Sequence, residues 1–519
     1  MNYTSTRNSS LSVTAADAIA RGISADGGLF VPSTDLPKFS LEDIQNLADK
    51  SYQERAFEVL KIFLNFSDDE LWKSIKQAYY HPNFRTAGVT RLVELDSSAY
   101  MLELWHGPTA AFKDMALQIL PGLLGASAKK VFQTDRIVIL TATSGDTGKA
   151  ALEAFSGVPG VEIAVFYPEN GVSETQRLQM TTQLGENIHV FGVNGNFDDC
   201  QKAVKDIFAD EKIVKLAEKS GAILASANSI NWGRLCPQIA YYVSAYADLV
   251  RLKKIKCGDK INICVPTGNF GNILAAYYAM QLGIPVEKLI CASNSNNILS
   301  DFINTGVYDK NREFCTTISP SMDILVSNNL ERLLYHLSGN SDSTVKEWFT
   351  SLNKDGKFEV DRKIKTKMKS MFYGGWCSED ETLETIKSLF VKFGYLSDTH
   401  TAVGYKVLQD YITETGSKIK TIIASTASPY KFEEAVYEAL YGKYEPTIDE
   451  LIEASGNTTD GVVQAKKPDL ANVLFEKTSI PIPKPLLGLN ERQVRFTESA
   501  EISEIRDLTE SLFNLIAHS

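Results

Sequence analysis

Short apolar runs alternate with stretches of helical periodicity from about residue 136 onward. The runs are RIVILTAT (136–143), VEIAVFYP (161–168), NIHVFGVNG (187–195), AILASA (222–227), INICVPT (261–267), KLICAS (288–293) and KTIIAST (420–426). Continuous apolar runs of this length predict strands that are buried on both faces of a parallel sheet, with amphipathic helices between them. The pattern therefore predicts an α/β fold, in which functional loops follow the carboxyl ends of the strands.

The first 95 residues follow a different pattern. LEDIQNLADKSYQERAFEVLKIFL (41–64) has helical periodicity and comes after a glycine-rich turn, ADGGLFVP (25–32). This predicts a separate, mainly helical N-terminal unit. Farther along, residues 310–390 are charged and are predicted to be mostly helical, and ASGNTTDGVVQAKKPDLANV (454–473) is predicted to be a polar surface insertion.

Length and charge narrow the class of protein. A chain of 519 residues favours roughly two to four domains. The formal net charge of −11 argues against a nucleic-acid partner, because a phosphate-binding face needs clustered Lys and Arg. We therefore expect a multidomain, soluble, folded protein of enzyme size.

The termini, cysteines and histidines exclude several further classes. The N-terminus has no apolar leader and no long apolar run occurs, so we expect a cytoplasmic protein without a membrane span. The seven cysteines form no CxxC pair and the six histidines show no ligand spacing. These residues predict neither a disulfide framework nor a metal site.

One predicted strand runs into SGDTGKAALEAF (144–155), a turn of small and polar residues that opens a helix. Backbone N–H groups at a helix N-terminus bind carboxylate or phosphate when small residues permit close approach. A nucleoside triphosphate site is excluded, because a Walker loop would need glycine at Thr143 and Ser or Thr at Ala150. The alternative is a plain strand-to-helix turn.

Two further loops have the same character. TGNFGN (267–272) follows a predicted strand, and its glycines allow a nest of amides around a phosphate. SANSINWGRLCPQ (226–238) supplies neutral donors and one arginine, whose planar fork suits oxyanions. The alternative for this last segment is a capped helix start with a surface arginine. Two anion loops in one α/β core predict a ligand with two anionic groups.

A single lysine stands among small and apolar residues in GPTAAFKDMALQ (107–118). A packed primary amine near loops that can hold phosphate and carboxylate is the arrangement that a Schiff-base enzyme needs. Pyridoxal 5'-phosphate fits every part of this pattern. The alternative is that Lys113 forms an exposed ion pair with the neighbouring Asp114.

Five motifs in this order resemble the threonine synthase family, specifically its longer fungal and bacterial form. They are HGPTAAFKD (106–114), TSGDTG (143–148), SANSINWGRL (226–235), VPTGNFGN (265–272) and STASP (425–429), preceded by YTSTRN (3–8) and DGGLFVP (26–32). The resemblance implies a fold-type II pyridoxal-phosphate enzyme, similar to the tryptophan synthase β subunit, with parallel-sheet domains and an N-terminal helical domain. The implied domains are 1–95 (N-terminal), 96–134 with 261–519 (large, cofactor-binding) and 135–260 (small, with substrate loops).

The resemblance also implies a role for each motif. Lys113 resembles the lysine that bonds the cofactor, and Thr426 resembles the hydroxyl partner of the pyridine nitrogen. The loop resembling the cradle of the cofactor phosphate consists of Gly268, Asn269, Phe270, Gly271 and Asn272. Substrate-binding positions are Thr143, Ser144, Gly145, Asp146 and Thr147 for the carboxylate, and Asn228, Ser229 and Arg234 for the substrate phosphate. The implied reaction converts O-phospho-L-homoserine and water into L-threonine and phosphate.

Several points stay open at this stage. The chain has Ser428 and Tyr430 where many family members have a histidine and a small residue, which leaves the role of position 428 undecided. His400, in SDTHTAVGY (397–405), is expected to be structural. Rival functions are a pyridoxal-phosphate-dependent phospho-lyase or dehydratase on a related substrate, and a non-catalytic protein that kept the fold.

Overall fold

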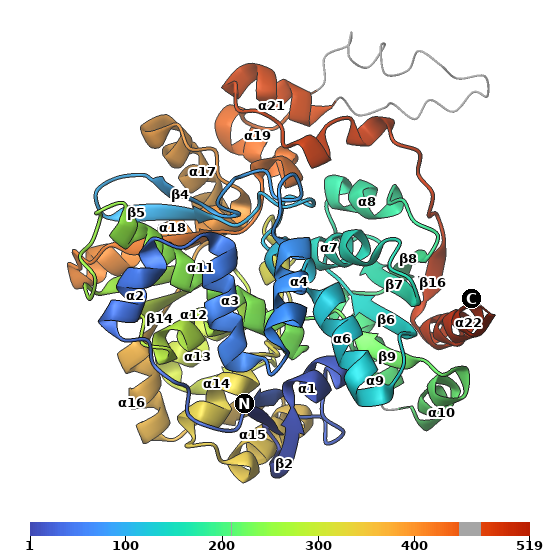
Figure 1. Ribbon diagram of the computed structural model, residues 1–519. Coiled ribbons are helices and arrows are strands. Elements are labelled where there is room, and N and C mark those ends of the chain that lie inside the picture. The colour runs from blue at the N-terminus through green and yellow to red at the C-terminus, as the bar shows by residue number, and fades with distance from the viewer. Residues whose placement is uncertain (209, 446–468, 519) are drawn as a thin grey trace, which may run out of the picture.

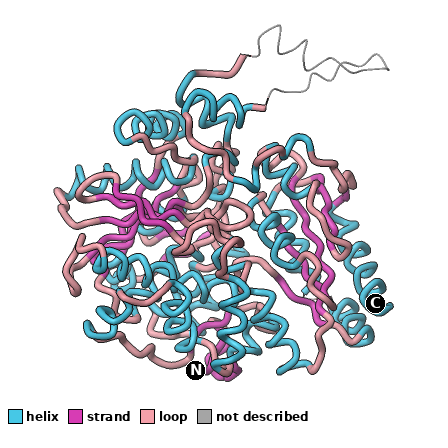
Figure 2. The backbone as a smooth tube through the Cα atoms, turned by 45° about the horizontal axis from the view of Figure 1, so that its top comes forward, coloured by secondary structure: helices cyan, strands magenta, loops and turns pink. Residues whose placement is uncertain are grey.

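The computed structural model describes residues 1–208, 210–445 and 469–518. Two parallel-stranded sheets lie on opposite sides of the molecule, and helices cover them (Figures 1 and 2). The fold is α/β, as the alternating pattern predicts.

The larger sheet has six strands in the order β14-β11-β10-β15-β5-β4. All neighbours are parallel except β4 and β5. Its strands are β4 (Arg91–Glu94), β5 (Ala99–Glu103), β10 (Ile261–Pro266), β11 (Val286–Ser293), β14 (Phe372–Trp376) and β15 (Thr421–Ser425). The helices of this part are α5 (Asp114–Leu117), α6 (Leu120–Phe132), α11 (Trp232–Arg251), α12 (Gly271–Gln281), α13 (Ile298–Thr305), α14 (Leu330–Leu337), α15 (Asp342–Asp355), α16 (Arg362–Met371), α17 (Glu379–Phe393), α18 (Thr399–Thr415), α19 (Glu433–Tyr441) and α21 (Leu470–Thr478).

The smaller sheet has five parallel strands in the order β16-β8-β7-β6-β9. Its strands are β6 (Ile137–Ala142), β7 (Val161–Pro168), β8 (Ile188–Asn194), β9 (Ile223–Ser226) and β16 (Ser499–Glu501). Its helices are α7 (Asp146–Phe155), α8 (Glu174–Thr181), α9 (Phe197–Phe208), α10 (Glu211–Ser220) and α22 (Ile505–His518).

The last strand and helix correct one predicted boundary. Sequence analysis assigns 261–519 as a whole to the large domain, but β16 pairs with β8 and α22 packs on α10, β6 and β7 of the small sheet. Phe513 and Ile516 of α22 lie in one apolar cluster with Leu140 and Phe166 of that sheet. The C-terminal segment therefore completes the small domain.

The strands are apolar along their whole length because both faces of each sheet are covered. In β6, Ile137 and Ile139 belong to the main core, whereas Val138 and Leu140 belong to the cluster beneath α9, α10 and α22. Two-sided burial explains why continuous apolar runs mark parallel strands. Each of the seven runs predicted from sequence forms a strand. The strand β14 was not predicted, because it lies in the segment 310–390, which was expected to be mostly helical.

The N-terminal region contains a three-stranded antiparallel sheet and four helices. They are β1 (Asn2–Ser5), β2 (Asn8–Thr14), α1 (Ala15–Arg21), β3 (Phe30–Pro32), α2 (Leu41–Ala48), α3 (Tyr52–Phe63) and α4 (Asp68–Ala78). Trp232 at the start of α11 packs against Tyr3 and Phe63 of this region and Tyr278 of α12. The N-terminal region thus shares one apolar core with the large sheet.

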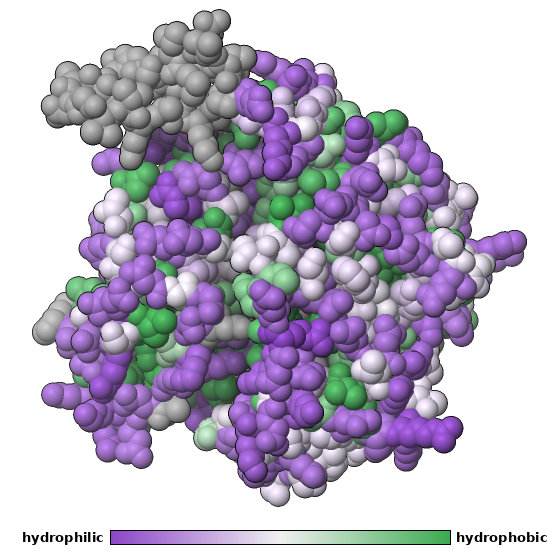
Figure 3. All heavy atoms as spheres, turned by 180° about the vertical axis from the view of Figure 1, so that it is seen from behind, coloured by the Kyte–Doolittle hydropathy of each residue, from purple (hydrophilic) through white to green (hydrophobic). Residues whose placement is uncertain are grey.

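A small two-stranded antiparallel sheet, β12 (Val307–Asp309) with β13 (Lys357–Glu359), lies beside α13 and α15. The predicted polar insertion at 454–473 lies mostly outside the described residues. On the face shown in Figure 3, hydrophobic side chains form separate areas among hydrophilic ones. Within the described ranges, none of the helices combines the length and the apolar composition that crossing a bilayer requires.

Candidate active site

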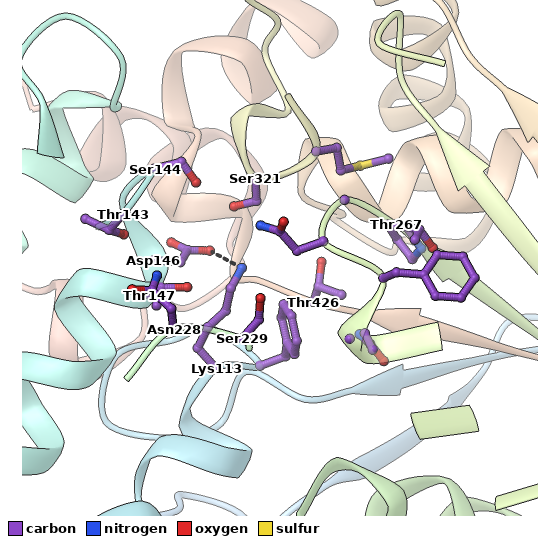
Figure 4. Close-up of a pocket in the computed structure, with 18 of the residues that line it drawn as sticks. Lys113, Thr143, Ser144, Asp146, Thr147, Asn228, Ser229, Thr267, Ser321 and Thr426 are labelled. Atoms are coloured by element: carbon purple, nitrogen blue, oxygen red, sulfur yellow. Dashed lines mark ion pairs between the residues drawn. The ribbon is translucent and has the colours of Figure 1, made fainter. Parts of the chain in front are cut away.

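A cavity lies where the loops after β6, β9, β10 and β15 come together. Every predicted site residue except Gly145 lines it, so segments far apart in the sequence meet at one place. Figure 4 shows Lys113 and Asp146 pointing toward each other across this cavity. The rule that functional loops follow the carboxyl ends of parallel strands accounts for the location.

Lys113 is held by a loop that pairs with the end of β15. Ala111 forms a β-bridge with Ala427, and the Phe112 N–H donates to the Thr426 carbonyl at 2.7 Å. Nζ of Lys113 lies over the Phe112 ring and 3.8 Å from Oδ2 of Asp146. The residue is 9% exposed, and burial lowers the pKa of its ammonium to about 8. The amine is therefore within reach of its neutral, reactive form.

The alternative of an exposed Lys113–Asp114 pair is wrong. Asp114 is fully buried, and its carboxylate accepts hydrogen bonds from the backbone N–H and the hydroxyl of Thr109. Burial raises the pKa of Asp114 to about 6. Asp114 thus shapes the loop before the lysine, while the ion-pair partner of Lys113 comes from α7.

That partner, Asp146, is the first residue of α7. Its other oxygen, Oδ1, accepts from Gln176 at 2.8 Å and forms an ion pair with Lys431 at 2.9 Å. The two lysines hold the pKa of Asp146 well below its usual range, although burial acts in the opposite direction. Because this side chain is anionic, the loop can hold a substrate carboxylate through its backbone N–H groups and hydroxyls but not through Asp146 itself.

The rest of this loop is arranged around Thr143. Its hydroxyl accepts from the Gly145 and Gly148 N–H groups at 2.9 and 2.8 Å, which fixes the turn into α7. Gly145 has φ 120°, and a Cβ there would meet Gln176 at 2.4 Å. Ser144 and Thr147 line the cavity and are half-buried. Thr143 therefore shapes the loop, and Ser144 and Thr147 present hydroxyls to the cavity.

The loop after β10 forms a second anion-binding arrangement. Phe270 adopts the left-handed conformation, and α12 begins after it without a side-chain cap. Uncapped N–H groups at a helix start attract anions. Nδ2 of Asn272 is buried without a hydrogen-bond partner among the described residues. The segment that contains Ser321 packs closely against this loop, since a Cβ on Gly268 would lie 2.5 Å from the Ser321 carbonyl oxygen.

Arg234, in the first turn of α11, supplies a buried cation. It is 3% exposed, one of its terminal nitrogens donates to the Ala227 carbonyl, and Nε has no partner among the described residues. No carboxylate of the described residues pairs with the guanidinium, and burial lowers the pKa of Arg234 to about 10. The alternative of a surface arginine is therefore wrong, because a buried guanidinium in a cavity wall calls for an anion.

Asn228 and Ser229 are predicted to bind the substrate phosphate together with Arg234, but they differ in the hydrogen bonds that they already form within the protein. The Asn228 amide accepts from the Ala142 N–H and donates to the Ala142 carbonyl, so it joins the ends of β6 and β9. Ser229 lines the cavity, and its carbonyl accepts from Asn329. Ser229 is therefore the better candidate for contact with a ligand, whereas Asn228 mainly connects the ends of two strands.

The wall residues that were not assigned to the site from sequence include His400, Ser321 and Met322. Ser428 caps the turn after β15, accepting from the Tyr430 N–H, while its own N–H donates to the Ala110 carbonyl. These contacts give position 428 a structural role. Lys431, which contacts Asp146, was also missed, because its partner lies in a different domain and no local motif marks the contact.

Comparisons with known proteins show the family of the chain. Models of protein families match residues 2–79 (Threonine synthase N terminus), 84–360 (Pyridoxal-phosphate dependent enzyme) and 401–508 (Threonine synthase, C-terminal). Threonine synthase of Pseudomonas aeruginosa is 40% identical over 445 residues, which cover 85% of this chain and 91% of that protein. The chain belongs to the threonine synthase family.

Two other members of the threonine synthase family extend the comparison. The crystal structure of PLP-bound threonine synthase from Brucella melitensis has a TM-score of 0.83 at 34% identity, with 100% of both chains covered. Threonine synthase-like 1 of Homo sapiens is 41% identical over 435 residues. These cover 82% of this chain but 58% of the human protein, so the chain spans little more than half the length of that relative.

The residues present fit the cofactor of this family of pyridoxal-phosphate dependent enzymes. Its aldehyde needs a primary amine, and Lys113 supplies a buried one. Its phosphate needs donors, and α12 begins with an uncapped turn beside the unpartnered amide nitrogen of Asn272. Its ring nitrogen needs a polar partner, and Thr426 lines the same cavity. The donor set therefore matches the three polar parts of pyridoxal phosphate.

Proposed function

We propose that this chain is a pyridoxal-phosphate-dependent lyase that converts O-phospho-L-homoserine and water into L-threonine and phosphate. The observation that carries the proposal is the pairing of a buried amine with a buried guanidinium in one cavity. Lys113 and Arg234 both line it, and Arg234 has no carboxylate partner among the described residues. An amino-acid substrate with a phosphate leaving group matches these two groups.

Each residue has a proposed task in this reaction. Lys113 is the attachment point of the cofactor and the base that removes and returns protons at the α- and β-carbons of the substrate. When bound, the cofactor supplies an electron-withdrawing ring that delocalises negative charge from the α-carbon. Thr426 holds the ring nitrogen through a hydroxyl, and the loop 268–272 holds the cofactor phosphate.

The leaving group and the carboxylate are proposed to occupy opposite sides of the amine. Arg234, with Ser229, stabilises the departing phosphate through charge-assisted hydrogen bonds in a buried site. The first N–H groups of α7, with Ser144 and Thr147, orient the substrate carboxylate. Asp146 faces Lys113, and its negative charge keeps the carboxylate of the substrate away from the amine.

The cysteines support a cytoplasmic location for this reaction. All seven lie within the described residues, and each is a free thiol. Free thiols are typical of proteins in reducing compartments.

Product analysis tests the proposal directly. The protein is incubated with pyridoxal phosphate and O-phospho-L-homoserine, and threonine, phosphate, 2-oxobutyrate and ammonia are quantified. Threonine and phosphate in equal amounts are expected. Phosphate with 2-oxobutyrate and ammonia would instead assign a phospho-lyase, and the absence of any product would favour the non-catalytic alternative.

A further inference from the structure

Lys431 is a completely buried lysine that contacts three oxygen atoms. It ends the short 3-10 helix Pro429–Lys431 after β15 and is 0% exposed. Its Nζ lies 2.7 Å from Oε1 of Gln179, 3.1 Å from the Thr109 carbonyl oxygen and 2.9 Å from Oδ1 of Asp146. An ammonium has three N–H donors, so each has an acceptor and none remains for a ligand.

The carboxylate of Asp146 divides its two oxygens between two lysines. Oδ1 contacts Lys431 and Gln176, whereas Oδ2 lies 3.8 Å from Nζ of Lys113. The contact with Lys431 is therefore the closer of the two ion pairs. Because Lys431 already neutralises Asp146, the carboxylate does not depend on a proton at Lys113.

Four charged groups act on the Lys113 amine from the elements around it. Asp146 on α7 and Asp398 at the start of α18 favour the ammonium, while Arg234 on α11 and Lys431 oppose it. Asp398 already accepts from His400, the other titratable wall residue. Without Lys431, Lys113 would be the one cation that pairs with this buried carboxylate among the described residues, and the proton would be retained there.

We propose that Lys431 is a positioning residue that serves as the closer counter-ion of Asp146, and that this leaves the Lys113 amine available as a neutral nucleophile and base. The inference rests on the proposed function only in giving Lys113 its chemical role. The contacts with Thr109 and Gln179 add a second effect. They hold two elements against the same ammonium: the loop that precedes Lys113, and α8. Lys431 therefore also sets the distance between Lys113 and Asp146.

The proton affinity of Lys113 can be measured without any cofactor. The full-length unloaded protein is treated with formaldehyde and cyanoborohydride over a range of pH, and methylation of Lys113 is followed by peptide mass spectrometry. Only the neutral amine reacts, so the rate reports the titration midpoint. In Lys431→Met the midpoint is expected to rise by about 1 pH unit, and Asp146→Asn is expected to lower it. An unchanged midpoint in Lys431→Met overturns the proposal.

Lys149→Met is the matched control. Lys149 is also a buried lysine, on α7, but it pairs with Glu153 and Gln183. Its loss should leave the Lys113 midpoint in place. A similar rise in this variant would mean that any buried charge has the effect, and would contradict a specific role for Lys431.

Two comparisons cover the remaining outcomes. If Lys431→Met does not fold, Lys431→Gln, which keeps hydrogen-bonding atoms but loses the charge, is measured in its place, and an unchanged midpoint there overturns the proposal. In the Asp146→Asn background, loss of Lys431 should move the midpoint much less than in the wild type, because the carboxylate through which Lys431 acts is gone; an equal shift in both backgrounds would contradict the proposal. If the wild-type protein takes up no pyridoxal phosphate, the proposed function fails, while the methylation midpoints still decide the role of Lys431.

Discussion

Nε2 of His400 accepts a hydrogen bond of 3.1 Å from the backbone N–H of Ser321, while its Nδ1 lies 3.0 Å from Oδ1 of Asp398. Because Nε2 accepts, the proton of the neutral ring is on Nδ1 and donates to Asp398. His400 thereby ties the start of α18 to the segment that packs against Gly268. It lines the cavity and also has the structural role expected from sequence.

Replacing His400 should loosen the cofactor site without removing a reacting group. His400→Leu loses the acceptor for the Ser321 N–H, which is worth about 0.5–1.5 kcal/mol. Pyridoxal phosphate affinity, measured by absorbance titration, is expected to fall roughly 2- to 10-fold. The affinity of His400→Gln, which keeps a hydrogen-bond acceptor, should fall less. Equal affinity in all three proteins would show that the hydrogen bond does not position the loop.

Gly268→Ala should damage the same site by direct contact. Its Cβ would lie 2.5 Å from the Ser321 carbonyl oxygen, a backbone atom that cannot rotate away. The loop must shift, and a loss of about 1–3 kcal/mol in cofactor binding is expected from such overpacking. Gly125→Ala is the control, because a Cβ there meets nothing within 4 Å. The prediction fails if both variants bind pyridoxal phosphate as the wild type does.

The strands and most of the site were predictable because each has a local signal. The run around Ile139 is apolar at every position, since both faces of the sheet are covered. The segment of β14 has no such signal, because its two glycines are required by close packing; a Cβ on Gly374 would lie 2.9 Å from the Ser300 carbonyl oxygen. Lys431 and β16 were missed because their partners come from another part of the chain.

Lys113 should lower the stability of the unloaded protein near neutral pH. Its pKa is about 8 in the folded protein and 10.5 in an exposed lysine. Between these values the unfolded chain binds more protons, so the free energy of unfolding rises with pH there. Below about pH 8 the buried ammonium is at its most unfavourable. Lys113→Met should then raise the free energy of unfolding by up to about 3 kcal/mol.

Urea unfolding of unloaded wild type and Lys113→Met at several pH values measures this difference. The stability gain of the variant should be largest at neutral pH and should shrink as the pH rises from about 8 toward 10.5. Lys202→Met, at an exposed lysine, is the control and should show no such trend. A gain independent of pH would mean that methionine packs better and that the charge is irrelevant.

Thr426→Val should change the cofactor site while leaving the fold intact. Thr426 is 5% exposed and lines the cavity, and its backbone carbonyl, which holds the Lys113 loop, is unaffected by the substitution. Loss of a buried hydroxyl partner is worth roughly 0.5–1.5 kcal/mol. A shifted absorbance spectrum of the bound cofactor and a weaker affinity are expected. An unchanged spectrum and rate would make Thr426 only the end of a core strand.

Arg234→Leu should separate substrate use from cofactor binding. The guanidinium is buried beside the cavity without a carboxylate partner in the described residues. The charge-assisted contact that we propose for it with a substrate phosphate would be worth about 1.5–3 kcal/mol. We expect a loss of roughly 10- to 150-fold in kcat/KM, with nearly unchanged affinity for pyridoxal phosphate. Leucine also removes an unpaired buried cation, so the free energy of unfolding should not fall.

Arg234→Lys is the companion variant, because it keeps the charge but loses the planar fork. It should recover part of the lost kcat/KM, since an ammonium binds phosphate as a point charge. Both variants are titrated with O-phospho-L-homoserine and separately with pyridoxal phosphate, and their unfolding is compared with that of the wild type. Normal substrate use by Arg234→Leu, or joint loss of cofactor and substrate through unfolding, would move the leaving-group site away from Arg234. Ser229 and the start of α7 would then be the next donors of the cavity wall to test.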